Sequence, residues 1–101
     1  MELNPDNLEI SYVMGVYNET QQSIVVTYRF FGYPDKVKCN FYMDGIIAKN
    51  LYEELFSGQH TMAVDFLKND IDMEKTHDVG VCCGGACKSE KLEPSSWVLY
   101  E

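Results

Sequence analysis

Basic residues are scarce in this chain of 101 residues: eight Lys and Arg stand against sixteen Asp and Glu, which gives a net charge of -8. Such an excess of negative charge repels phosphate backbones and anionic lipid headgroups, so we expect no nucleic-acid and no membrane partner. No apolar run approaches the ~20 residues of a membrane-spanning helix. The N-terminal fifteen residues carry no positive charge, so we also expect no export signal.

Sequence motifs of the common enzyme classes are also missing. The chain has no glycine-rich phosphate-binding motif and no G-x-S-x-G nucleophile motif. A nucleophilic cysteine would need a nearby base, and only His60 and His77 are available. Both histidines begin predicted strands, where an imidazole more often binds a backbone group or lies at the rim of the sandwich. We therefore expect a protein that is not an enzyme and that holds no cofactor.

What the sequence has instead is a two-residue alternation of apolar and polar side chains, the period of a strand with one buried face. In the first such segment, the alternation assigns Leu8, Ile10, Tyr12 and Met14 to the buried face. We predict seven strands, over residues 8–17, 23–31, 36–45, 46–55, 59–67, 77–83 and 95–101.

Turn residues separate these segments. Asp44 and Gly45 form a dipeptide that favours a tight hairpin turn, which makes residues 38–51 the clearest hairpin in the chain. Residues 51–56 also fit a short helix, because their leucines and phenylalanine have helical spacing. Both interpretations of that segment stay open.

Short strands that recur every ~8–12 residues, with turns between them, are typical of sandwiches and barrels. No linker, internal repeat or low-complexity tract divides the chain. We predict an all-β fold, an antiparallel β-sandwich of about seven strands, as a single domain over residues 1–101.

The four cysteines are weak candidates for a metal site. Structural zinc usually takes two cysteine pairs separated by a dozen or more residues, whereas here Cys82, Cys83 and Cys87 cluster and Cys39 is distant. Alternation assigns Cys39 and Cys83 to the core, close enough for contact, while Cys82 and Cys87 flank a glycine turn that a bridge could span. Without an export signal the default is reduced thiols, and whether either pair is bridged stays open.

An acidic segment at residues 68–78 is a second candidate for metal binding. Asp70, Asp72 and Glu74 share one side of an extended chain and could offer oxygen ligands to calcium. The segment lacks the glycine and the terminal glutamate of an EF-hand loop. A solvated acidic loop is the favoured interpretation.

Tyrosine is abundant, with seven residues, more than one small core can use. Exposed tyrosine offers apolar area with a polar tip, which favours contacts with other proteins. The residues we assign to such an interface are Tyr12, Tyr17, Tyr33, Tyr42 and Tyr52.

Two predicted strands begin close to short sequence motifs, Gly-Gln-His-Thr at residues 58–61 and Thr-His-Asp-Val at residues 76–79. With the hairpin at 38–51, this order resembles the immunoglobulin-like or fibronectin-type-III-like modules of tailed-bacteriophage virion proteins. The resemblance implies an antiparallel immunoglobulin-like β-sandwich of about seven strands that acts by docking. Because the chain starts with Met and ends just after its last predicted strand, we expect a free-standing module.

The leading hypothesis is a non-enzymatic virion protein, a capsid-decoration or tail-associated module that docks on other virion proteins through edge strands and exposed tyrosines. It would be made in the host cytoplasm, reside in the virion and could form a homo-oligomer on a lattice. One alternative is a carbohydrate- or cell-surface-binding adhesin domain. A second alternative is an acidic inhibitor of a host nucleic-acid-binding protein.

Overall fold

The computed structural model describes residues 2–32, 36–50 and 54–100. Within these ranges the chain forms ten strands and two short 3₁₀ helices. Neither of these helices has the length and apolar character needed to span a membrane. The elements are η1 (Pro5–Asn7), β1 (Leu8–Tyr17), β2 (Gln21–Phe30), β3 (Lys36–Val37), β4 (Cys39–Met43), β5 (Ile46–Asn50), β6 (Leu55–Phe56), β7 (Gly58–Leu67), β8 (His77–Cys83), β9 (Ala86–Leu92), η2 (Pro94–Ser96) and β10 (Trp97–Leu99).

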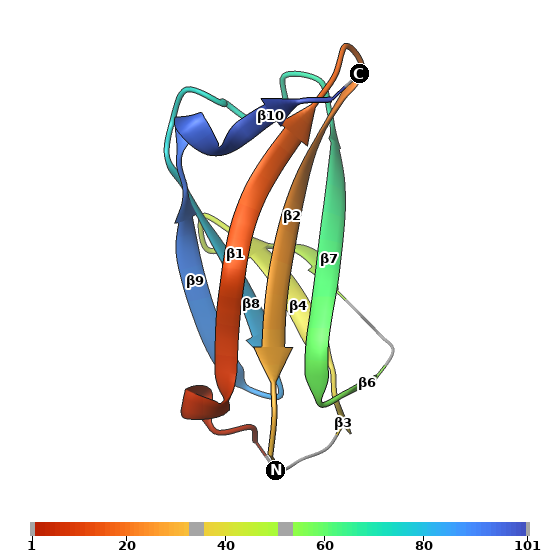
Figure 1. Cartoon of the computed structure of the whole chain (residues 1–101), viewed down its shortest axis with the longest axis vertical. Coiled ribbons are helices and arrows are strands. Elements are labelled where there is room, and N and C mark those ends of the chain that lie inside the picture. Colours follow the sequence, from red (N-terminus) through yellow and green to blue (C-terminus); the bar gives the residue numbers. More distant parts are fainter. Residues whose placement is uncertain (1, 33–35, 51–53, 101) are drawn as a thin grey trace.

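Two four-stranded sheets make up most of the fold (Figure 1). One has the order β10-β1-β2-β7 and the other β5-β4-β8-β9, while β3 and β6 form a small separate pair. Neighbouring strands are antiparallel except β10, which runs parallel to β1. The all-β prediction is confirmed, but the expectation of purely antiparallel pairing is wrong at β10.

The core lies between the two sheets, because alternate side chains of each sheet point toward the other. The predicted inner faces of residues 23–31, 59–67 and 77–83 are the buried or half-buried faces of β2, β7 and β8. Burial also raises the pKa of Tyr28 to about 12. The fully buried side chains with the largest volumes are Tyr28, Phe30, Phe41, Leu3, Leu8, Ile24 and Leu92.

Strand β1 departs from the predicted alternation at a β-bulge. Its register with β2 shifts between Ile10 and Tyr12, so a residue is added on one strand only. Leu8 and Ile10 contact the core as predicted, but beyond the bulge Val13 takes the inner position. The prediction that Tyr12 and Met14 lie on the buried face is therefore wrong.

Two-residue turns close both hairpins of the second sheet. Asp44 and Gly45, between β4 and β5, have φ angles of 52° and 82°, and Gly84 and Gly85, between β8 and β9, have 57° and 89°. Two consecutive positive φ angles give a turn whose twist matches that of the strands it joins. The predicted hairpin at residues 38–51 is confirmed within the described ranges.

Several strand boundaries differ from prediction. β5 ends at Asn50, and residues 55–56 form the short strand β6 rather than the end of a helix, while 51–53 lie outside the described residues. Strand β9 was not predicted, because only its first and last residues are buried and its interior shows no alternation.

Candidate protein-interaction surface

The structure separates the tyrosines that we assigned to an interface. Tyr12 is 52% exposed on the outer side of β1, whereas Tyr17 is half-buried at the end of the same strand. Tyr42 is half-buried on β4, in the opposite sheet. Tyr33 and Tyr52 lie outside the described residues. The described members therefore do not form one tyrosine cluster.

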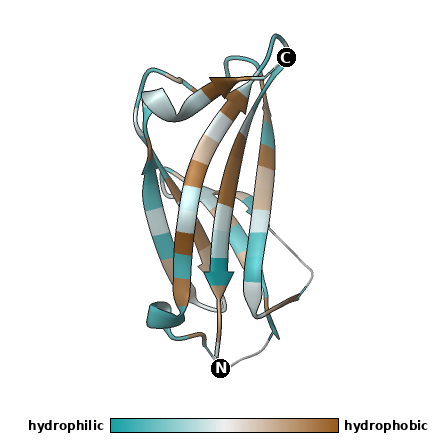
Figure 2. Ribbon diagram, viewed as in Figure 1, coloured by the Kyte–Doolittle hydropathy of each residue, from teal (hydrophilic) through white to brown (hydrophobic). Residues whose placement is uncertain are grey.

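A different apolar surface lies on the outer side of the β10-β1-β2-β7 sheet. Its strands align Met14 with Val25, and Val16 with Val98, on the side of the sheet that faces away from the core. Figure 2 shows hydrophobic bands on the neighbouring strands β1, β2 and β10. We name this surface the outer apolar face, and its members are Tyr12, Met14, Val16, Val25 and Val98.

This face departs from the prediction that each strand has one polar side. β1 and β2 instead carry apolar residues on both sides, as Val25 beside Val26 and Val13 beside Met14 already show in the sequence. Val98 is 50% exposed and the other aliphatic members are half-buried. Exposed apolar patches of this kind are typical of interaction sites.

All four cysteines form disulfides, which corrects the expectation of reduced thiols. Cys39 and Cys83 are direct partners on β4 and β8, and Cys82 and Cys87 are direct partners on β8 and β9. The Cα atoms of each pair lie 4.1 Å apart. Adjacent Cys82 and Cys83 point to opposite sides of β8, as alternation requires.

These bridges bear directly on the metal hypothesis. A sulfur in a disulfide is neither a thiolate ligand nor a nucleophile, so in this form Cys39, Cys82, Cys83 and Cys87 cannot bind zinc or attack a substrate. Among the residues that the structure describes, no group of three or more His, Cys, Asp or Glu side chains is placed to hold a metal ion.

In the acidic loop between β7 and β8, the carboxylates bind the loop itself. Asp70 accepts a hydrogen bond from the backbone N–H of Leu67 at 3.2 Å, and Asp72 accepts one from the N–H of Glu74 at 3.0 Å. The side-chain amide of Gln22 exchanges two hydrogen bonds of 2.8 and 2.9 Å with the backbone of buried Ile71. The carboxylates shape the turn, and the Gln22 amide fixes the loop to β2.

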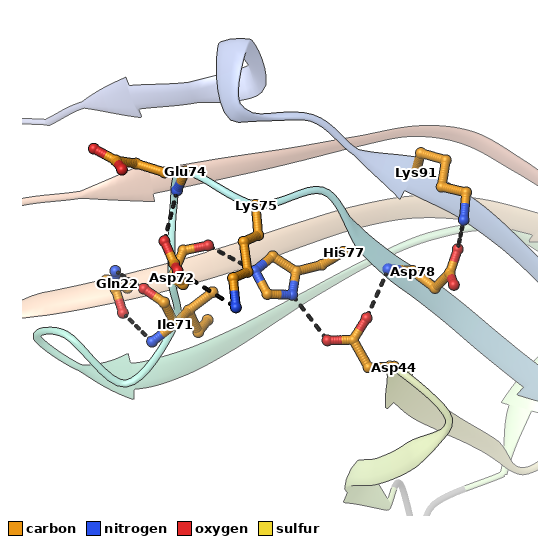
Figure 3. A network of polar contacts seen from close by, with 9 residues as sticks. All are labelled: Gln22, Asp44, Ile71, Asp72, Glu74, Lys75, His77, Asp78 and Lys91. Carbon is orange, nitrogen blue, oxygen red and sulfur yellow. Dashed lines mark hydrogen bonds and ion pairs between the residues drawn. The ribbon is translucent and has the colours of Figure 1, made fainter.

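His77 connects this loop to the β4–β5 turn, as Figure 3 shows. Its Nδ1 lies 2.8 Å from a carboxylate oxygen of Asp44, and its Nε2 lies 2.7 Å from the backbone carbonyl of Asp72. Both contacting oxygen atoms are hydrogen-bond acceptors, so only the imidazolium form of His77 can donate to both. The hydrogen bond with Asp44 raises the pKa of His77, and the same bond lowers the pKa of Asp44.

The His77 contacts predict a stability that depends on pH. Because the folded pKa of His77 is raised above its ordinary value of 6.5, the stabilisation is fully present below that pH. It is lost as pH rises through the raised pKa. We expect Asp44→Asn to flatten this fall, measured by urea unfolding at several pH values between 6 and 9. An equal fall in both proteins would contradict the assignment.

His60 is also used structurally. Its Nε2 lies 2.7 Å from the backbone carbonyl of Phe56, and its ring stacks on Phe30 with centroids 5.5 Å apart. Each histidine thus contacts a backbone carbonyl, one of the two roles expected of a histidine at a strand entrance.

Comparison of the chain with known proteins gives no match. No family model matches the chain, and no curated protein and no solved structure matches it either.

Proposed function

We propose that this chain is a non-enzymatic docking module, and that its outer apolar face binds another protein. The observation that carries the proposal is the row of apolar side chains on the side of the β10-β1-β2-β7 sheet that faces away from the core. Tyr12 and Val98, each about half exposed, supply accessible contact area beside Met14, Val16 and Val25. An interface core is typically apolar and includes aromatic residues, as this face does.

Virion proteins are the partner class that we propose, specifically a capsid or tail protein of a tailed bacteriophage. The sequence resemblance motivates this choice, and two features of the molecule support it. Two disulfides suit a protein that works outside a reducing cytosol, as virion and secreted proteins do. A net charge of -8 keeps free copies soluble before they assemble.

The finer fold assignment is part of the same proposal. Seven of the described strands have five or more residues, namely β1, β2, β4, β5, β7, β8 and β9. They divide between two facing sheets, with connections that cross from one sheet to the other. This division supports an immunoglobulin-like or fibronectin-type-III-like sandwich to which β3, β6 and β10 are additions.

Co-sedimentation with purified virus-like particles from the same source tests the function. We expect the wild-type protein to sediment at a fixed ratio to one particle protein. A double variant that combines Tyr12→Lys with Val98→Lys is expected to bind the particles at least about ten-fold more weakly. Ile46→Lys is the matched control, because Ile46 is 72% exposed on the other sheet. Loss of binding in the control alone, or no binding by the wild type, would contradict the proposal.

A further inference from the structure

Four strands form the edges of the two large sheets, and three of them are protected against pairing with another chain. β10 has only three residues, β5 is short with an irregular register, and β9 carries a run of exposed charged and polar side chains. Short length, irregularity and charge are the usual devices that prevent edge strands from associating.

β7 has none of these protections. It extends over ten residues, and its register with β2 is unbroken from Gly58 to Leu67. It contains no proline, lysine or arginine. Asp65, its one charged residue, accepts a hydrogen bond of 2.6 Å from the hydroxyl of Ser23 on β2. One carboxylate oxygen is thus directed toward β2 rather than toward the outer edge of β7, with which no other described strand pairs.

The hydrogen-bonding groups on this edge can be assigned. The Lys49 ammonium lies 3.4 Å from the carbonyl oxygen of Ala63, so this carbonyl points away from β2. In an antiparallel ladder, alternate residues direct both backbone groups to the same side. Gln59, Thr61 and Asp65 therefore present their N–H and C=O groups to the edge, as Ala63 does.

We propose that β7 pairs with β7 of a second copy of this chain, antiparallel and about a two-fold axis at Ala63. This centre pairs the most edge-facing residues of β7, because Gln59, Thr61, Ala63, Asp65 and Leu67 of one copy then align with the same five residues of the other in reverse order. Thr61 lies opposite Asp65 of the second copy, where the hydroxyl can donate to the carboxylate, and no like charges face each other. Two sheets of four strands join into one of eight.

Side chains on both faces fit this register. On the outer side, Ala63 meets its own copy, and its small size permits close approach. On the inner side, Met62 lies opposite Val64 and His60 opposite Phe66, which continues the apolar core across the axis. Lys49 has to release the Ala63 carbonyl, and because Lys49 is exposed this long contact is weak.

A self-complementary patch about a two-fold axis is the geometry of a closed dimer, and it leaves no second β7 edge for further growth. The outer apolar faces of the two copies then lie on the same side of one sheet. This dimer does not depend on the proposed virion partner, and the purified protein alone is sufficient to test it.

Sedimentation equilibrium over a range of concentrations tests the dimer. We expect the wild type to form dimers and no larger species. Ala63→Lys places like charges opposite each other at the axis and is expected to raise the dissociation constant at least about ten-fold. Ser89→Lys, the same kind of change on the β9 edge, is the control and is expected to leave the dimer intact.

Amide hydrogen exchange on the wild-type protein gives a second measurement that needs no variant. We expect the amides of Thr61, Ala63 and Asp65 to exchange more slowly as concentration rises, while that of Met62, already bonded to β2, stays unchanged. The proposal would be overturned if the wild-type protein were a monomer at every concentration, or if Ala63→Lys dimerised as strongly as the wild type. It would also be overturned if the β7 amides were protected only after a different protein is added.

Discussion

Replacing Cys39 and Cys83 together by alanine is expected to lower the free energy of unfolding by about 4 kcal/mol, the larger of the two effects expected from removing a single disulfide. A disulfide lowers the entropy of the unfolded chain, and this effect grows with the logarithm of the number of residues in the loop that it closes. The Cys39–Cys83 bridge joins residues 44 apart. Both side chains are fully buried, so their loss also leaves unfilled space in the core. Urea unfolding under non-reducing conditions measures the change.

The second bridge supplies the matched control. Cys82 and Cys87 are only five residues apart, so Cys82→Ala with Cys87→Ala is expected to cost about 2 kcal/mol. Adding a reductant to the wild type should lower its stability by more than either pair of substitutions does. The assigned pairing would be contradicted if replacing Cys82 and Cys87 lowered the free energy of unfolding by more than replacing Cys39 and Cys83 does.

Phe41→Ala is expected to destabilise the fold by about 3–5 kcal/mol, because a fully buried aromatic ring leaves a cavity between the two sheets. Phe41 is 0% exposed and lies beside Val81 on the inner face of the second sheet. Thermal or urea unfolding measures the effect, with the disulfides left intact so that both folded and unfolded states keep the same cross-links.

Tyr42→Ala is the control for this substitution. Tyr42 is the next residue on β4, and its side chain points away from the core into a shallow hollow with Gly80 and Ser89. We expect a loss under about 1 kcal/mol. Similar losses for Phe41→Ala and Tyr42→Ala would show that β4 is not packed with one face against the other sheet.

The inner faces of β2, β7 and β8 could be predicted because the core-facing side chains recur at every second residue along each strand, with no bulge between them. The alternation from Ile24 to Phe30 matches the buried positions, and so does that from His77 to Cys83. β1 could not be predicted in the same way, because apolar residues on both sides of Val13 conceal the bulge. β9 was missed since its only contact with the core is through its two ends.

The interaction surface was harder to predict than the fold. Tyrosine content indicated a contact surface, but the position of each ring depends on strand register and sheet order, which are set by pairing between distant residues. Tyr12 faces solvent only because of the bulge, and Val98 joins the surface only because β10 pairs in parallel with β1. The disulfide pairings depend on the same long-range register.

The two bridges on β8 also determine how the chain would bear mechanical tension between its ends. Because Cys82 and Cys83 are adjacent, the shortest covalent path enters at Cys39, crosses to Cys83, passes one peptide bond to Cys82 and leaves at Cys87. Residues 40–81 and 84–86 lie off this path and carry no load. Under tension only the segments outside the bridges can extend, so β4, β8 and β9 remain tied together at the bridged residues however far the two ends are pulled.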